Sequence, residues 1–306
     1  MSRIEEILAK AAREGQVRRT ADIETDVMAP MEPRARLSAL QPAAPPRPTA
    51  VARPVAAPSP GMPLAMPTGA PAHAAVANPV LTAVQTVRSI RPHPLLVAAR
   101  APHSAAAEQY RAIRTRIAQS EGDRRCRTIM VTSPLHSDGK TLTALNLALT
   151  MAQEFHRRVV AIDADLRNGS LHKLFGLPDG PGLSDVLTGS IPLDQALVSL
   201  PDLRLTILPA GSPASQPTEL LGSAEMRRVV DTLHTQFDRI VVDTPPASPL
   251  ADVGVLSPLI DGIVLVVRAG RTPRPAIDRA LAEFDPDRLL GLVLNDVEEP
   301  RMETRL

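Results

Sequence analysis

Aromatic residues are nearly absent from this 306-residue chain, which has no tryptophan, one tyrosine (Tyr110) and four phenylalanines. Proteins that bind single-stranded nucleic acid stack the bases on aromatic side chains, so this class of function is excluded early. The formal net charge is only +1, and the chain as a whole has no strong field that would attract nucleic acid or an anionic membrane. We therefore expect no nucleic-acid partner.

The chain also has a single cysteine and no long apolar run. Cys126 alone cannot form a disulfide framework, and its presence suits a reducing cytoplasm. The first residues, MSRIEEILAKAAREGQ, carry acids where a signal peptide needs an apolar core. No apolar run approaches the roughly 18 residues of a membrane-spanning helix. These absences predict a cytoplasmic protein without a membrane span, which a partner would have to recruit to the inner face of the membrane.

Proline is abundant, and about half of the 32 prolines lie between Pro30 and Pro102 among alanines. Such a segment has too few bulky apolar side chains to offset the entropy lost on ordering, and proline interrupts helices and sheets. We predict a disordered Pro/Ala-rich linker over residues 16–100, which is either a simple tether or a polyproline ligand. Ahead of it, residues 1–15 are predicted to form a short amphipathic helix, which is either a docking helix for a partner or a frayed terminus.

Residues 101–306 have the composition of one folded α/β domain. Short aliphatic runs without polar alternation are typical of strands that are covered on both faces of a parallel sheet. These runs are RTIMVTS, RRVVAID, LRLTILPAG, DRIVVDTPP, DGIVLVVRAG and LLGLVLND. Segments with helical periodicity separate them, at 140–156, 218–235, 249–260 and 273–284. The alternation predicts a doubly wound, mostly parallel sheet of the P-loop NTPase type.

The stretch VTSPLHSDGKTLT has the features of a phosphate-binding loop between a strand and a helix. In such a loop, backbone N–H groups and the N-terminus of the helix face the phosphates of a nucleotide. Lys140 would reach the β- and γ-phosphates, and the Thr141 hydroxyl would bind Mg²⁺. The residues predicted to contact ATP are Ser137, Asp138, Gly139, Lys140, Thr141 and Leu142.

The loop departs from the pattern G-x-x-x-x-G-K-[ST] at its first position, where Pro134 stands in place of glycine. Proline fixes φ near −65° and has no N–H group, so position 134 cannot cradle a phosphate through its amide. The donors nearest to the β- and γ-phosphates would come from residues 137–141, which all keep their N–H groups. We therefore expect an altered affinity or rate and not the loss of the site.

Acidic residues follow two of the predicted strands. Asp163 and Asp165 lie two residues apart at the end of RRVVAID, so their side chains point the same way. Asp243 ends another aliphatic strand in the arrangement of a Walker B motif, whose carboxylate holds Mg²⁺. Each acid alone could be a polar strand end with nearby ion pairs. Because a doubly wound sheet places its site at the carboxyl ends of its strands, the acids and the Gly-Lys-Thr turn together predict a Mg·ATP site.

Two of these segments, AIDADLRNGSLHKLFG and IVVDTPP, are similar to the Walker A′ and Walker B signatures of bacterial tyrosine kinases. These are P-loop enzymes that control capsule and exopolysaccharide synthesis. The segments SAAAEQYRAIRTRI, PTELLGSAEM and DGIVLVVRAGRTPRPAI also resemble the family, and the resemblance covers about residues 100–296. The short N-terminal segment and the linker resemble the soluble, exosortase-associated branch, in which the membrane partner is a separate chain.

The resemblance implies an ATP- and Mg²⁺-dependent protein tyrosine kinase and a role for each site residue. Lys140 and Thr141 would bind phosphate and Mg²⁺, and Asp243 would organise the metal. Asp163 would be a metal-linked carboxylate that also accepts the proton of the substrate hydroxyl, with support from Asp165. Phosphoryl transfer needs little covalent help, so positioning and charge neutralisation would supply most of the rate.

The resemblance also implies contacts beyond the phosphates. Asn295 ends the last predicted strand, where an asparagine of the family lies near the nucleotide base. Glu108, Arg111 and Arg114 match the E-x-x-R-x-x-R segment, which packs on the neighbouring subunit in ring-like oligomers of the family; without the resemblance it would be a solvated charged helix. The implied partner is a membrane-embedded polysaccharide chain-length regulator that activates the kinase.

The sequence differs from the family in two ways. Members that phosphorylate themselves end in a tyrosine cluster, whereas this sequence ends LNDVEEPRMETRL and has its tyrosine, Tyr110, in the E-x-x-R-x-x-R segment. Autophosphorylation of a C-terminal tyrosine tail is therefore not possible, and the target would be a tyrosine of another protein. In the phosphate-binding loop, Ser137-Asp138 replace the usual Gly-Glu, and Pro134 replaces a small residue.

Two other functions are compatible with these residues. A nucleotide-gated switch like the MinD/ParA ATPases would hydrolyse ATP without phosphorylating a protein, but those ATPases usually carry an extra lysine early in the loop, which SPLHSDGKT lacks. A degenerate scaffold would keep the fold for oligomerisation and partner binding only. The complete set of carboxylates argues against a scaffold, whereas Pro134 and the absent tail tyrosines argue for it.

Overall fold

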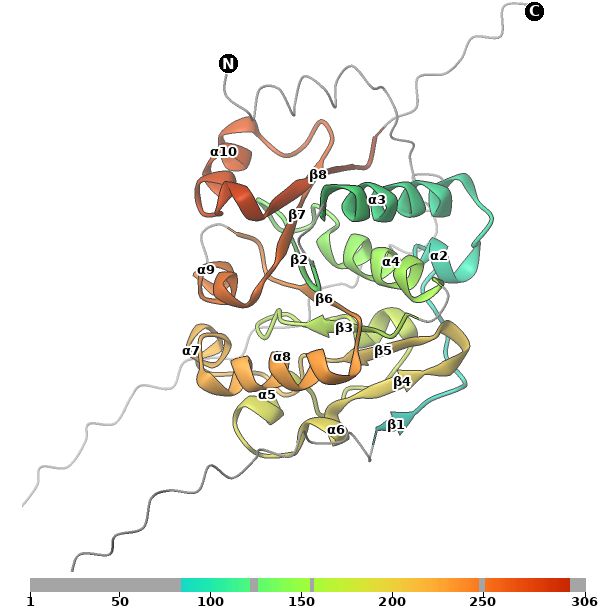
Figure 1. The fold of residues 1–306 in the computed structure, drawn as a ribbon, viewed down its shortest axis with the longest axis vertical. Helices are drawn as coiled ribbons and strands as arrows, with labels where there is room; N and C mark the ends of the chain where they lie inside the picture. The colour runs from blue at the N-terminus through green and yellow to red at the C-terminus, as the bar shows by residue number, and fades with distance from the viewer. Residues whose placement is uncertain (1–83, 122–125, 155–156, 248–250, 298–306) are drawn as a thin grey trace, which may run out of the picture. The chain divides into compact units, whose positions relative to one another are not determined.

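The structure, a computed structural model, describes residues 84–121, 126–154, 157–247 and 251–297. These residues form one eight-stranded sheet with the strand order β1-β4-β5-β3-β6-β2-β7-β8 (Figure 1). The strands are β1 (Gln85–Thr86), β2 (Thr128–Thr132), β3 (Val159–Asp163), β4 (Val198–Leu200), β5 (Leu205–Leu208), β6 (Arg239–Asp243), β7 (Gly262–Arg268) and β8 (Leu289–Asn295).

Helices connect the strands and cover both faces of the sheet (Figure 1). The α-helices are α2 (Val97–Arg100), α3 (Ala105–Glu121), α4 (Lys140–Ala152), α5 (Leu183–Leu187), α6 (Leu193–Ala196), α7 (Pro217–Leu221), α8 (Ala224–Gln236), α9 (Asp252–Leu256) and α10 (Arg274–Ala282). Short 3₁₀ turns lie at η1 (His172–Phe175), η2 (Pro201–Leu203), η3 (Ser257–Leu259) and η4 (Pro286–Arg288). None of the helices in the described ranges combines the length and the apolar composition that a membrane crossing requires.

The aliphatic runs form strands because both of their faces are buried. Along β2, Ile129 and Val131 belong to the core on one face of the sheet, and Met130 belongs to the core on the other. Helices α2, α3 and α4 lie over the first face, and α5 to α10 lie over the second (Figure 1). Neighbouring strands pair in parallel, except that β4 and β5 are antiparallel. The predicted doubly wound, mostly parallel sheet is confirmed.

The folded domain begins earlier than residue 101, and this corrects the C-terminal bound of the predicted linker. Residues 85–86 form β1 beside β4, Leu96 is fully buried, and the N–H of Ala98 donates to Asn146 Oδ1 of α4 at 3.0 Å. A segment rich in proline and alanine can still dock as an extended strap if a few apolar side chains are buried under it. The predicted helix at 1–15 and residues 16–83 of the predicted linker lie outside the described residues.

The predicted helices are present, but most are shorter than their periodic segments. The segment 218–235 is divided into α7 and α8 at Gly222, and the Ser223 side chain caps α8 by accepting from the N–H of Met226 at 3.2 Å. Helix α4 is buried on nearly all sides from Thr143 to Ala152, because α3 and α2 cover the side that faces away from the sheet. The buried position of α4 fixes its N-terminus, where the phosphate-binding loop ends.

Candidate active site

The loop after β2 enters α4 through a glycine that cannot be replaced without strain. Gly139 has φ +95° and caps the helix N-terminus. A Cβ atom at this position would lie 2.0 Å from Nδ2 of Asn295. That amide donates to the carbonyl of Asp138 at 3.0 Å. Asn295, which was expected near the nucleotide base, therefore packs on the backbone of the loop itself.

This close approach makes Gly139→Ala a test of the loop geometry. The positive φ alone should cost about 1–2 kcal/mol, and the clash with Asn295 should add about 1–3 kcal/mol. Gly189→Ala is the matched control, because Gly189 has φ +73° and an added Cβ atom there would meet nothing within 4 Å. Urea unfolding should show a clearly larger loss of stability for Gly139→Ala. Equal losses would mean that the loop yields freely to the added methyl group.

A second residue of the loop is held in the left-handed region. Ser137 has φ +64°, at the position where the resembling kinases use glycine. Pro134 is buried at the start of the loop, and the chain still passes from β2 through the loop into α4. Serine at position 137 therefore adds conformational cost, because an L-residue is disfavoured at positive φ.

We expect Ser137→Gly to stabilise the protein by about 0.5–1 kcal/mol, since glycine adopts this φ without steric cost. The measurement is the midpoint of urea unfolding at unchanged m-value. Ser215→Gly is the control, because Ser215 is exposed and is absent from the residues with positive φ. Glycine at position 215 should destabilise slightly. A loss of stability at both positions would contradict the strain assigned to Ser137.

The Asp138 side chain contacts the loop itself and the segment after β7. Its carboxylate is buried; Oδ2 accepts from the N–H of Leu135 at 3.0 Å, and Oδ1 accepts from the Thr272 hydroxyl at 2.8 Å. The two oxygens of Asp138 thus join the loop to the segment after β7. Thr272 was not predicted as a site residue. The signal that could have found it is its position just after the carboxyl end of β7.

Arg268, at the end of β7, is another contact that the sequence did not predict. Its Nε lies 2.9 Å from Oδ2 of Asp296, and its Nη1 donates to the carbonyl of Ser137 at 3.4 Å. Together with Thr272 and Asn295, it fixes the loop to the carboxyl ends of β7 and β8.

Lys140 and Asp165 form a nearly buried ion pair, with 3.2 Å between Nζ and Oδ2. Asp165 Oδ1 also accepts from the N–H of Asn168 at 3.0 Å. Burial lowers the pKa of Lys140, but the negative charges of Asp243, Asp165 and Asp163 outweigh it, and the net pKa is raised. Lys140 is thus held as an ammonium ion at the N-terminus of α4, where phosphate oxygens would bind.

Asp163 is fully buried at the end of β3. Its Oδ1 accepts from the N–H of Asp165 at 3.2 Å and its Oδ2 from that of Leu171 at 3.0 Å. Burial raises the pKa of Asp163 to about 6, against the lowering effect of the Leu171 hydrogen bond, and the charge of Asp165 adds to the increase. The carboxylate is therefore held firmly by backbone donors, while its affinity for a proton is greater than that of a free aspartate.

Asp243 lies directly opposite Asp163 in the register of β6 and β3. Burial raises the pKa of Asp243 to about 7, against the lowering effect of Lys140, and the charge of Asp163 adds to the increase. The Thr141 side chain hydrogen-bonds to this carboxylate. Among the described residues, none forms a hydrogen bond with the buried Oδ1 of Asp243. One buried carboxylate oxygen is therefore available for a cation.

The donor set fits Mg²⁺ bound together with a nucleotide. Within the described ranges, no group of three or more His, Cys, Asp or Glu side chains is arranged to hold a metal by itself. Mg²⁺ in nucleotide sites is held by one or two carboxylates together with phosphate oxygens and water, so a cage made only of protein is not needed. Asp243 with its unpaired Oδ1 and the Thr141 hydroxyl provide the hard oxygen ligands of such a site.

The comparisons with known proteins agree with this geometry. No protein-family model matches the chain. Over 202 residues it is 35% identical to the tyrosine-protein kinase YwqD of Bacillus subtilis, a match that covers 65% of this chain and 85% of YwqD. The chain belongs to the bacterial tyrosine-protein kinase family. The family resemblance predicted from the sequence is therefore confirmed, whereas the assignment to the soluble branch stays a prediction.

Two further relatives define how much of the family's architecture is shared. The tyrosine-protein kinase ptk of Acinetobacter johnsonii is 32% identical over 196 residues, which are 63% of this chain and 26% of ptk. The kinase domain of the Escherichia coli tyrosine kinase ETK has a TM-score of 0.64 and 25% identity, covering 74% of this chain and 93% of that domain. The match thus lies in the kinase domain of the family.

The family's E-x-x-R-x-x-R residues lie on α3, and all three make contacts within this chain. Arg111 pairs with Glu108 at 2.6 Å and donates to the carbonyl of Pro102 at 2.7 Å. Arg114 pairs with Glu154 at 3.1 Å and donates to the carbonyl of Thr150 at the end of α4 at 2.8 Å. Any contribution of Arg114 to an interface would come in addition to this support of α4. Oligomerisation through these residues stays a prediction.

Tyr110 also faces α4. Burial raises the pKa of the Tyr110 hydroxyl, which lies beside the Thr143 and Asn146 side chains. Asn146 also donates to the carbonyl of Leu95 at 2.9 Å. The tyrosine thus packs where α3, α4 and the strap before α2 meet.

Proposed function

We propose that the chain is an ATP-dependent protein tyrosine kinase of the bacterial type. The observation that carries this proposal is the convergence of Lys140, Thr141, Asp163 and Asp243 at the carboxyl ends of three adjacent strands. Lys140 and the N–H groups of residues 137–142 would bind the phosphates, and Thr141 and Asp243 would hold Mg²⁺. When bound, the metal would neutralise charge on the transferred phosphoryl group.

Two aspartates would act on the side where the substrate hydroxyl arrives. Asp163 has a pKa of about 6, which suits a group that accepts a proton near neutral pH. The backbone donors from Asp165 and Leu171 hold its carboxylate in a fixed orientation. Asp165 would position Lys140 through their ion pair at 3.2 Å. A second metal contact through Asp163 is compatible with its remaining lone pairs.

The phosphate acceptor would be a tyrosine of another protein. The sequence has one tyrosine, Tyr110, and its hydroxyl lies against Thr143 and Asn146 of α4. We propose that the target and the activator belong to exopolysaccharide or capsule export, with a membrane-embedded chain-length regulator as the partner and a homo-oligomer as the working form. In ptk the matched region is only 26% of a longer chain, which supports a kinase domain that works beside further protein parts.

The test is transfer of labelled γ-phosphate from ATP to tyrosine. The purified chain is incubated with Mg²⁺, labelled ATP and the cytoplasmic segment of a chain-length regulator, with a Glu/Tyr copolymer as a general acceptor. Label on tyrosine that disappears with Asp163→Asn supports the proposal. Phosphate release without labelled protein would instead indicate a nucleotide-gated switch, and no nucleotide binding would indicate a scaffold.

A further inference from the structure

Residues 84–96, which include β1 and end just before α2, form a proline-rich strap on the domain. Within it, the sequence RPHP over residues 91–94 places prolines at alternate positions. Proline lacks an N–H group and favours an extended backbone at the residue before it. N–H donors are therefore left at Arg91 and His93, and an extended chain points the N–H groups of alternate residues to the same side.

Both of these donors bind the 3₁₀ turn η1. The N–H of Arg91 donates to the carbonyl of Phe175 at 3.0 Å, and the N–H of His93 donates to the carbonyl of Leu174 at 2.7 Å. The strap lies close to the turn at this point. Gly176, which ends η1, has φ +69°, and a Cβ atom there would lie 3.3 Å from both Cβ and the carbonyl oxygen of Arg91. The strap is thus fixed to the C-terminal end of η1.

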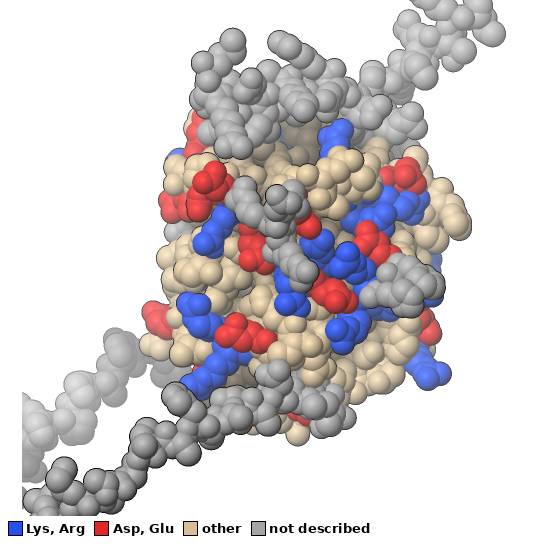
Figure 2. Space-filling view, viewed as in Figure 1, with Lys and Arg blue, Asp and Glu red and all other residues tan. Residues whose placement is uncertain are grey.

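Buried apolar side chains support the same contact. Leu96 of the strap is fully buried in one core cluster with Leu171 and Phe175, and Asn146 of α4 donates to the carbonyl of Leu95 at 2.9 Å. Figure 2 shows basic and acidic side chains mixed over the face in view, without a broad patch of one sign that could hold the strap by charge. The strap therefore depends on specific short-range contacts, and the loss of one backbone donor should act locally.

The turn η1 in its turn holds Asp163. It is four residues long, and such a short turn has little stability of its own, so its position depends on tertiary contacts. Across the turn, the N–H of Leu174 donates to the carbonyl of Leu171 at 3.2 Å. The N–H of Leu171 donates to Oδ2 of Asp163 at 3.0 Å. A continuous series of backbone hydrogen bonds therefore leads from His93 of the strap to the Asp163 carboxylate.

We propose that the strap positions Asp163 for catalysis, and that the backbone N–H groups of Arg91 and His93 are the groups that do so. They hold η1, and through the Leu171 N–H they fix the orientation of the Asp163 carboxylate. The inference rests on the proposed kinase function, in which this carboxylate accepts the proton of the acceptor hydroxyl. Proton transfer needs a well-aligned carboxylate, whereas ATP is bound by the separate phosphate-binding loop. Loss of the strap contact should therefore lower kcat and leave KM for ATP nearly unchanged.

The test is His93→Pro in the full-length protein, which removes the donor and keeps a residue suited to an extended backbone. By NMR, the Leu171 amide should exchange with deuterium about five- to tenfold faster, because its support is lost. The kcat for phosphate transfer to a Glu/Tyr copolymer should fall by about tenfold or more, with KM for ATP within about twofold. His93→Ala is the matched control. It keeps the N–H and loses the ring, whose Nδ1 accepts from the N–H of Leu95 at 3.2 Å, so both quantities should stay close to those of the wild type.

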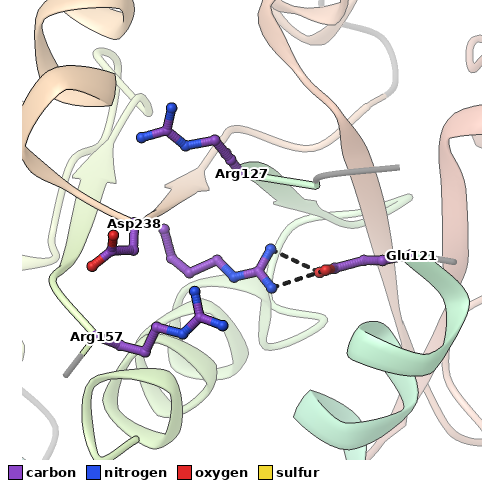
Figure 3. A pocket seen from close by; sticks show the side chains of 5 residues that line it. Glu121, Arg127, Arg157 and Asp238 are labelled. Atoms are coloured by element: carbon purple, nitrogen blue, oxygen red, sulfur yellow. Dashed lines mark hydrogen bonds and ion pairs between the residues drawn. The ribbon is translucent and has the colours of Figure 1, made fainter. Parts of the chain in front are cut away.

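A second control separates positioning from a general loss of stability. At the amino ends of the strands, Oε1 of Glu121 lies 2.7 Å from Nη1 of Arg239, and both side chains are almost buried. Figure 3 shows this pair beside a hollow at that end of the sheet. Strands β3 and β6 are five residues long, so the pair is about 17 Å from their carboxyl ends. Glu121→Gln should lower the midpoint of unfolding, because it leaves a buried guanidinium without its carboxylate. It should leave Leu171 exchange and kcat unchanged.

Three results would overturn the proposal. The first is unchanged Leu171 exchange in folded His93→Pro. The second is an equal effect of His93→Pro and His93→Ala, which would assign the effect to the ring. The third is an equal loss of kcat in Glu121→Gln, which would indicate lost stability. If the wild type transfers no phosphate to tyrosine, the proposed function fails, and Leu171 exchange still decides whether the strap holds η1. If His93→Pro does not fold by circular dichroism, Arg91→Pro replaces it, because it removes the donor to Phe175.

Discussion

Replacing Lys140 with methionine is expected to weaken Mg·ATP binding by roughly a hundredfold, measured by calorimetry at pH 7.5. Methionine has a similar length but cannot donate to phosphate oxygens. The expected loss of ATP affinity is larger than that from removing an exposed lysine. The reason is that the Lys140 ammonium offsets the charges of Asp163, Asp165 and Asp243. Without it, these carboxylates would repel the incoming phosphates at short range.

Lys173→Met is the matched control for this experiment. Lys173 is an exposed lysine in η1, and its replacement should leave ATP affinity within about twofold. Thermal unfolding of both variants without nucleotide shows whether the fold is kept. Unchanged ATP affinity in folded Lys140→Met would remove the assignment of this loop as the phosphate site.

The second large effect is expected from Asp243→Asn, which should stabilise the metal-free protein above pH 7 while it abolishes Mg²⁺-dependent ATP binding. The pKa of Asp243 is about 7 in the folded protein and near 3.9 in an unfolded chain. The folded state therefore binds more protons between these values. The stability linked to this group is fully present below pH about 4 and is lost as the pH rises through about 7.

Urea unfolding in EDTA between pH 4 and pH 8 measures this dependence. The wild type should lose about 2–4 kcal/mol from this carboxyl over the interval, and Asp243→Asn should remove most of that slope. Asp278→Asn, on the exposed face of α10, should leave the slope as it is. A wild-type stability that increases steadily from pH 4 to pH 8 in EDTA would contradict the raised pKa.

Much of the candidate site at the carboxyl ends of the strands could be predicted, because it depends on local sequence patterns. An aliphatic run that ends in aspartate predicts both a buried parallel strand and the end of the sheet at which its carboxylate lies, and Asp163 and Asp243 both lie at this end, opposite each other. The Gly-Lys-Thr turn likewise predicts the start of α4 at Lys140.

Contacts that join distant segments could not be predicted in this way. The hydrogen bond between Thr272 and Asp138 spans 134 positions, and that between Asn295 and Asp138 spans 157. The docking of residues 84–100 was missed for a related reason. Composition over a window records many prolines, whereas docking depends on single buried residues such as Leu96 and on the pairing of β1 with β4.

Helical spacing also could not predict the partner of each side chain on α3. The spacing of Glu108, Arg111 and Arg114 identified a charged helix, but Arg114 pairs with Glu154 and with the end of α4. Both a neighbouring subunit and a neighbouring helix can satisfy the same arginine. The choice depends on tertiary packing, which no short segment contains.

The acids at the strand ends and the phosphate-binding loop should differ in how well they tolerate sequence change. The reason is that the strand register sets Asp163 beside Asp243. The acids are placed by backbone ladders between adjacent strands about 4.8 Å apart, so slipping one strand by a residue would turn its carboxylate to the other face of the sheet. The loop is placed by side chains, among them those of Thr272, Asn295 and Arg268. Substitutions such as proline at 134 and serine at 137 can therefore accumulate in the loop while the acids stay where the sheet puts them.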